Sequence, residues 1–130
     1  LYPMLDDRTG STVMPPAHQG RYLWTAEQNH YGWRTFLGKT PGSDKIPSHH
    51  VPARASTLSG LPSTYIAVGE LDLFYAENCS FAEKLEAAGI ATELYTVPGA
   101  FHAFESIAPQ SQLANEFNQH LLQALERFGH

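Results

Sequence analysis

The sequence has little cysteine, little charge and no long hydrophobic run. Its 130 residues include a single cysteine, Cys79, which excludes an internal disulfide framework and a zinc site built from several cysteines. Charged residues make up 16% of the chain and the formal net charge is −5, so the composition provides no basic surface for nucleic acid or an anionic membrane. No apolar stretch approaches the ~18–20 residues that span a bilayer. We therefore expect no nucleic-acid partner and no membrane span. The single free cysteine and the lack of a basic leader followed by an apolar stretch are compatible with a cytoplasmic location, which we expect.

Several catalytic and nucleotide-binding motifs are also absent from the sequence. There is no Gly-x-Ser-x-Gly motif, which would place a nucleophilic serine on a sharp turn, and no His-Gly-Gly-Gly-type segment to donate backbone amides to an oxyanion. Neither Gly-x-Gly-x-x-Gly nor a phosphate-binding P-loop is present, which argues against a nucleotide-binding domain. Cys79 has no basic neighbour that would lower its pKa, so we do not expect a catalytic thiolate.

The apolar content is high enough for a buried core. Hydrophobic residues make up 42% of the chain and aromatic residues 12%, which predicts one compact domain of ordinary size. The chain opens on the apolar residues 1–5 without an initiator methionine. We expect this beginning to lie inside a longer protein.

Extended and helical patterns alternate along the chain. Residues 64–68 (TYIAV) are apolar on both faces, which is typical of a strand buried between two helical layers. Thr25 and Gln28 have the capping-box spacing that starts a helix. The expected strands are residues 1–5, 64–68 and 92–97, and the expected helices are residues 26–37, 75–88 and 112–128. Successive strand–helix units predict a parallel sheet with right-handed crossovers, and therefore an α/β fold.

Two loops at the carboxyl ends of the expected strands carry the polar groups that could do chemistry. Residues 69–74 (GELDLF) follow one strand and residues 98–104 (PGAFHAF) follow the next. In open α/β sheets, functional residues gather at these ends. A carboxylate at Asp72 that accepts from Nδ1–H of His102 would fix the histidine tautomer and leave Nε2 free to take a proton from a nucleophile.

Each of these residues also has a structural interpretation. Asp72 could cap the helix expected to follow it, and Glu70 could be the acid in its place. His102 could be a buried histidine with one backbone hydrogen bond. His49 and His50 are typical of a surface loop rather than a metal site. An aromatic cluster could line an acyl pocket or be ordinary packing; its members are Trp24, Tyr31, Trp33 and Phe36.

Four collinear segments resemble the hormone-sensitive-lipase-like esterases, a family with the α/β-hydrolase fold. Residues 1–8 (LYPMLDDR) resemble the segment that begins the C-terminal third of these esterases. Residues 52–62 (PARASTLSGLP) resemble the approach to the penultimate core strand of the family. Residues 69–72 resemble its acid loop, and residues 99–104 resemble its histidine loop. The matches span nearly the whole chain.

The resemblance implies that the chain is the C-terminal part of an α/β-hydrolase, with about three parallel strands and flanking helices. Residues 11–50 would form a cap-like or connecting segment, and residues 51–130 a βαβα catalytic-core segment. Asp72 would be the acid of a Ser-His-Asp triad and His102 its general base, with Glu70 in a supporting role. No cofactor and no metal are expected in this family.

In the family, the serine and the oxyanion segment lie upstream of the position where this chain begins. We therefore expect the whole protein to be a carboxylic ester hydrolase. We expect this chain by itself to be inactive. An exposed flank of a parallel sheet favours pairing with another chain, so we expect association with the missing N-terminal part of the same protein or with itself. The family also implies homodimers through the edge strand and terminal helix. The alternative is a non-catalytic small-molecule-binding module of the same fold.

Overall fold

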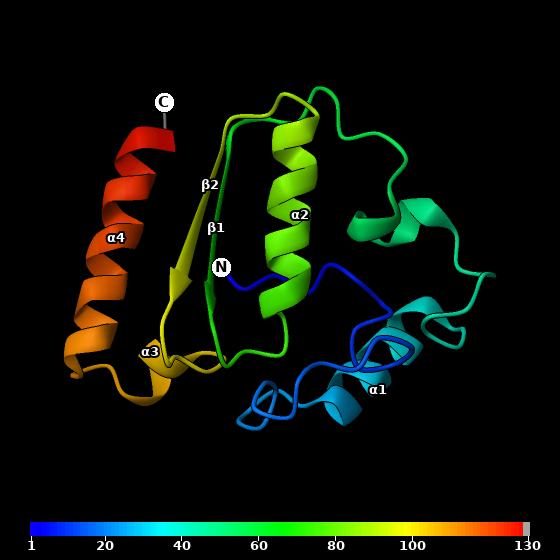
Figure 1. Ribbon diagram of the computed structural model, residues 1–130, viewed down its shortest axis with the longest axis horizontal. Coiled ribbons are helices and arrows are strands. Elements are labelled where there is room, and N and C mark those ends of the chain that lie inside the picture. Colours follow the sequence, from blue (N-terminus) through cyan, green and yellow to red (C-terminus); the bar gives the residue numbers. More distant parts are fainter. Residues whose placement is uncertain (129–130) are drawn as a thin grey trace.

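In the computed structural model, which describes residues 1–128, a small parallel sheet lies between helices (Figure 1). The helices are α1 (Ala26–Leu37), α2 (Tyr75–Ala87), α3 (Phe104–Ile107) and α4 (Gln112–Phe128), and the strands are β1 (Thr64–Gly69) and β2 (Thr92–Val97). Two 3-10 turns, Ser48–His50 and Pro52–Arg54, interrupt the long loop before β1. Helices α2 and α4 flank the strands, while α1 and the first loops lie beyond α2 (Figure 1).

The sheet consists of β1 and β2, which pair in parallel from Thr64 opposite Thr92 to Gly69 opposite Val97. Successive residues of β1 point to opposite faces. Ile66 packs in a cluster with Leu85 of α2, whereas Ala67 packs in a cluster with Phe117 of α4. Both faces of β1 are therefore covered, which confirms the buried strand and the α/β class predicted from the apolar run.

The first residues do not form the third strand expected from their apolar character. Within residues 1–128, the structure has two strands rather than about three. Tyr2 donates its backbone N–H to the carbonyl of Ala67 at 2.7 Å, so the segment runs beside the free edge of β1. Pro3 has no N–H to continue a ladder, and Tyr2 has a φ of +33°, which is far from an extended strand. These two residues limit the pairing to one bond.

The helix ends follow the predicted capping signals. Thr25 accepts from the N–H of Gln28 while the Gln28 side chain accepts from the N–H of Thr25, which is the predicted capping box. Gly38 ends α1 with a φ of +61°. The four-residue α3 was not expected, because a single turn carries no helical periodicity. Ala103, directly before α3, has a φ of +55°.

A buried ion pair holds the loop before β1 against the N-terminal segment. Asp7 is fully buried and accepts from Arg54 at 2.7 and 3.0 Å and from the N–H of Gly42 at 2.6 Å. Removing one partner of such a pair leaves an uncompensated buried charge, which is strongly destabilising. The pair therefore ties together three regions that are far apart in the chain.

The proposed division near residue 50 into a connecting segment and a core segment stays a prediction.

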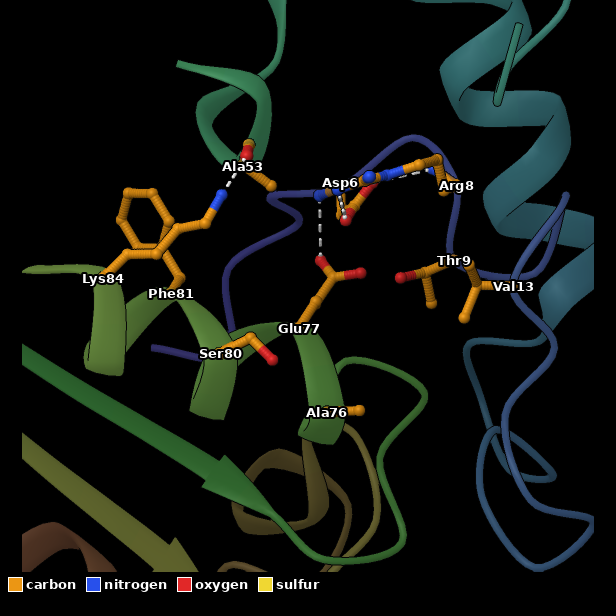
Figure 2. Close-up of a pocket in the computed structure, with 10 residues that line it drawn as sticks. All are labelled: Asp6, Arg8, Thr9, Val13, Ala53, Ala76, Glu77, Ser80, Phe81 and Lys84. Carbon is orange, nitrogen blue, oxygen red and sulfur yellow. Dashed lines mark hydrogen bonds and ion pairs between the residues drawn. The ribbon is translucent and has the colours of Figure 1, made fainter. Parts of the chain in front are cut away.

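Two adjacent side chains of α2 hold the N-terminal segment in place. Glu77 Oε1 accepts from the N–H groups of Leu5 at 2.6 Å and Asp6 at 3.3 Å, and Asn78 donates to the carbonyl of Pro3 at 2.9 Å. Figure 2 shows the other Glu77 oxygen pointing toward the Thr9 hydroxyl, beside a cavity of about 190 Å³. Burial raises the pKa of Glu77 from its ordinary value of 4.5 to about 7.

Because the pKa of Glu77 is raised in the folded chain, we expect the free energy of unfolding to depend on pH. The substitution Glu77→Gln should remove this dependence. Between about pH 4.5 and 7, folded Glu77 holds a proton that the unfolded chain has already lost. The free energy of unfolding therefore falls as pH rises through this window, by at most about 3 kcal/mol. Urea unfolding near pH 5 and near pH 8 measures this fall. The exposed Glu86→Gln on the same helix is the control and should keep the wild-type pH dependence. Parallel pH curves for Glu77→Gln and wild type would contradict the expectation.

Candidate active site

The two predicted loops meet at one edge of the sheet because β1 and β2 run in parallel and end opposite each other. The first loop turns sharply after β1, with the N–H of Asp72 donating to the carbonyl of Gly69 at 3.1 Å. The second loop begins after Val97, where the N–H of Glu70 donates to the Val97 carbonyl at 3.0 Å. The N–H of Leu71 donates to the Ala100 carbonyl at 2.9 Å. Backbone hydrogen bonds thus join the loops directly.

Within this junction, His102 Nδ1 lies 2.9 Å from Asp72 Oδ2. The Asp72 side chain is fully buried, whereas that of His102 is 18% exposed. With the proton on Nδ1, the imidazole donates to the carboxylate and its Nε2 lone pair is free. The structure therefore places a buried carboxylate against a partly accessible imidazole. This is the arrangement that a general base requires.

Asp72 does not cap α2 as the structural interpretation expected, because the N-cap residue is Phe74 and no side chain caps this helix. Its second oxygen, Oδ1, accepts from the N–H of Phe74 at 2.9 Å, immediately before α2. One carboxylate oxygen therefore stabilises the turn before α2, while the other contacts His102. Two hydrogen bonds fix the carboxylate, so the direction of Oδ2 is set by the turn and not by the histidine alone.

Glu70 lies in the same loop but has a different partner. Its Oε2 accepts from the N–H of Gly99 at 3.3 Å, and its backbone carbonyl accepts from Gln19 at 3.0 Å. Glu70 thus adds a contact between the acid loop and the histidine loop. Its supporting role stays a prediction, but the observed contact is compatible with it.

Three aromatic rings surround the imidazole of His102. Their centroids lie 4.7 Å away for Tyr2, 5.5 Å for Phe74 and 6.1 Å for Trp24. The sequence did not single out Tyr2, because nothing in a local pattern connects the second residue to a loop a hundred residues later. The rings keep most of the imidazole away from water and restrict its rotation.

The aromatic residues near α1 do not form one cluster: one is buried in the core, and the others line an open groove. Trp33 is buried with Ile46 and Val51 in a separate core cluster, so for this residue the packing interpretation holds. The others line an apolar groove along one side of α1; they are Trp24, Tyr31 and Phe36. Tyr31 and Phe36 are about 70% exposed. Trp24 belongs both to the lining of this groove and to the rings around His102.

The other groups considered in the sequence remain outside this site. His49 and His50 contact each other edge to face on an exposed turn. Burial raises the pKa of the Cys79 thiol, which disfavours a reactive thiolate. Within residues 1–128, no three histidine, cysteine or acidic side chains converge on a position for a metal ion. The expectation that neither metal nor cofactor takes part stays a prediction. No helix over the same residues is both long and apolar enough to cross a bilayer.

Comparison with known proteins identifies the class that this fold and loop arrangement define. A family model described as the alpha/beta hydrolase fold matches residues 1–106. The chain belongs to the alpha/beta hydrolase family. The resemblance of this chain to the hormone-sensitive-lipase-like esterases is also confirmed, because the proteins to which it is similar include esterases.

Two relatives of known structure cover almost all of this chain. Esterase LipW from Mycobacterium marinum is 30% identical with a TM-score of 0.78, covering 99% of this chain and 39% of its own. A bacterial heroin esterase is 29% identical with a TM-score of 0.85, covering 97% of this chain and 40% of its own. The ethyl acetate hydrolase of Pseudomonas putida is 23% identical over 98% of this chain. That match spans 39% of the hydrolase, so the chain spans about two-fifths of these relatives.

The contact between the two loops depends on a glycine at the end of β1. A Cβ at Gly69 would overlap the carbonyl oxygen of Ala100, so we expect Gly69→Ala to separate the loops and lower the free energy of unfolding by about 2–3 kcal/mol. Gly32→Ala in α1 is the matched control, because its Cβ would meet the nearest atom at 3.7 Å. It should be neutral or stabilising by up to ~1 kcal/mol. Urea unfolding of both variants tests this; equal stability would refute the close-approach explanation.

Proposed function

We propose that this chain supplies the acid and the base of a Ser-His-Asp triad in a carboxylic ester hydrolase, with Asp72 as the acid and His102 as the base. The observation that carries the proposal is the 2.9 Å contact between His102 Nδ1 and the buried Asp72 carboxylate. The partial exposure of the imidazole supports it as well, because a substrate must reach Nε2. The names of the relatives, an ethyl acetate hydrolase and several esterases, point to the same reaction class.

The chemistry follows from this geometry. A serine hydroxyl gives its proton to Nε2 of His102 as its oxygen attacks the ester carbonyl carbon. Asp72 holds the proton on Nδ1 and stabilises the positive imidazolium. His102 then gives the proton to the departing alcohol, which leaves an acyl-enzyme, and later takes a proton from the water that hydrolyses it. The serine and the amides that bind the oxyanion belong to the N-terminal part of the same protein, upstream of Leu1.

The free edge of β1 supports the proposed partnership with that N-terminal part. β1 is buried on both faces, yet only β2 pairs with it as a strand within residues 1–128. Apart from the one bond from Tyr2 to Ala67, this edge has no backbone partner within residues 1–128, and such an edge of a buried strand is a template for another strand. The possible homodimer would use the other edge, on β2, together with α4, where Leu122 and Leu125 are exposed.

The groove beside α1 suggests where the substrate lies. It is lined by aromatic rings, and one of them, Trp24, is also adjacent to His102. We assign the apolar acyl or alcohol part of the ester to this groove, since apolar walls with few polar groups are typical of small-molecule sites. A non-catalytic binding module of the same fold would also use such a groove. The paired Asp72 and His102 favour the hydrolase, because a module that only binds ligands does not need a general base.

Replacement of the acid tests the assignment. Asp72→Asn keeps an oxygen for the N–H of Phe74, but its amide can donate to Nδ1 and place the histidine proton on Nε2. In the protein that includes the upstream serine, we expect kcat to fall roughly 10³–10⁴-fold with little change in stability. Ester hydrolysis and urea unfolding measure the two effects, and the exposed Asp44→Asn is the control. If Asp72→Asn retains full activity, the acid is not Asp72, and Glu70 is the next candidate.

The 130-residue chain by itself should not hydrolyse esters. Without a nucleophile or oxyanion donors, the aspartate–histidine pair has only water to activate, and these missing groups provide most of the remaining rate enhancement. We expect the purified chain and its His102→Ala variant to hydrolyse a short-chain activated ester at the same background rate. Faster hydrolysis by the unchanged chain would show that the proposed division of the triad is wrong.

A further inference from the structure

Tyr2 has a strained backbone at the point where it contacts His102. Its φ of +33° lies in the left-handed region, which a residue with a Cβ occupies at a cost of about 1–2 kcal/mol. It also precedes Pro3, a position that favours extended backbone. Such a conformation persists only where the surrounding contacts enforce it, and these positions cluster at functional sites. The contacts that enforce it here are therefore informative.

Among the contacts that hold Tyr2, one is to a half-buried carboxylate. The backbone N–H donates to Ala67 of β1 at 2.7 Å, and the ring meets His102 edge-on with centroids 4.7 Å apart. The phenol donates to Glu105 Oε1 at 2.7 Å. The other oxygen of Glu105 is buried and has no hydrogen-bond partner within residues 1–128. Burial and the adjacent Glu105 raise the pKa of Tyr2 to about 12, so the phenol keeps the proton that it donates.

We infer that Tyr2 and Glu105 form a positioning pair that fixes the imidazole of His102 for its role as a base. The inference rests on the proposed function, and neither residue touches the reacting atoms. The hydrogen bond to Asp72 fixes one point of the imidazole but leaves rotation about that bond. Tyr2 limits this rotation from one side. Glu105, three residues after His102 and in the first turn of α3, sets where the Tyr2 ring lies.

Simple packing does not account for this pair. A ring that only fills space next to His102 needs no hydroxyl, and phenylalanine would serve as well. Instead, a carboxylate is held with one oxygen buried, and a buried charge costs free energy unless it is paired. The partly buried hydrogen bond at 2.7 Å links the N-terminal segment to the histidine loop. It acts on the orientation of the histidine and not only on the filling of the core.

Kinetics of the protein with its upstream segment test the inference. Tyr2→Phe keeps the ring but removes the hydrogen bond, and we expect kcat to fall about tenfold with KM changed less than about twofold, because small misplacement of a catalytic group lowers the rate of the chemical step. Glu105→Ala should have the same effect, and the double variant should be no worse than either single one. Glu105→Gln keeps an acceptor for the phenol and should restore most of the activity.

Tyr95→Phe is the matched control. Tyr95 also stacks on a histidine, His120, with centroids 4.2 Å apart, but this pair lies on β2 and α4, away from Asp72. It should leave kcat unchanged. Equal activity of Tyr2→Phe and Tyr95→Phe would overturn the inference, as would equal losses for Glu105→Gln and Glu105→Ala, because then the hydrogen bond would not be what matters.

Proton NMR of the same protein separates this inference from the proposed function. In the unchanged protein, we expect one sharp downfield signal for the His102 Nδ1 proton shared with Asp72. Tyr2→Phe should broaden it or abolish it, whereas Tyr95→Phe should not. If His102→Ala retains esterase activity, the proposed function fails, yet the NMR comparison still decides whether Tyr2 orients the ring. If His102→Ala abolishes activity but the signal and kcat are unaffected by Tyr2→Phe, only the positioning inference fails.

Discussion

The parallel pairing of β1 with β2 determines nearly everything that is informative about this chain. Since the strands end opposite each other at Gly69 and Val97, the loops that follow them leave the sheet side by side. Their backbones then hydrogen-bond to each other before any side chain contributes. A shift of the register would move one loop along the sheet and separate the carboxylate from the imidazole by several ångströms, because each residue of a strand advances about 3.3 Å.

Helix α2 connects this junction to the rest of the molecule. Its start is tied to Asp72 through the N–H of Phe74. Its first turn carries Glu77 and Asn78, which hold the N-terminal segment. The N-terminal segment in turn places Tyr2 against His102. One helix thus positions Asp72 directly and the ring of Tyr2 beside His102 indirectly, so changes on its buried side affect both.

The sequence predicted what local patterns and strand connectivity determine. The apolar run over residues 64–68 gave a buried strand, the Thr25–Gln28 spacing gave a helix start, and the order of strands and helices placed the Asp72 and His102 loops at one edge. Their catalytic roles are still a prediction. The rest depends on contacts across long sequence separations. Neither the ring of Tyr2 on His102 nor the pairing of Asp7 with Arg54 leaves a periodic signal.

The location of the third expected strand shows why an apolar run is an insufficient guide at a chain end. Residues 1–5 do lie beside β1, as a strand would, but Pro3 and the left-handed Tyr2 prevent a ladder. Trp33 shows the same limit in a helix, because its aromatic character suited both a pocket wall and a core, and the contacts with Ile46 and Val51 decided it.

Residues 64–104 form one continuous unit that contains both Asp72 and His102, whereas Tyr2 approaches the histidine from outside that unit. A gene fusion joining two homologous chains anywhere between residues 9 and 63 would therefore inherit Asp72 and His102 from one parent and Tyr2 from the other. Such chimaeras could keep Asp72 and His102 unaltered and still differ in how firmly the imidazole is held.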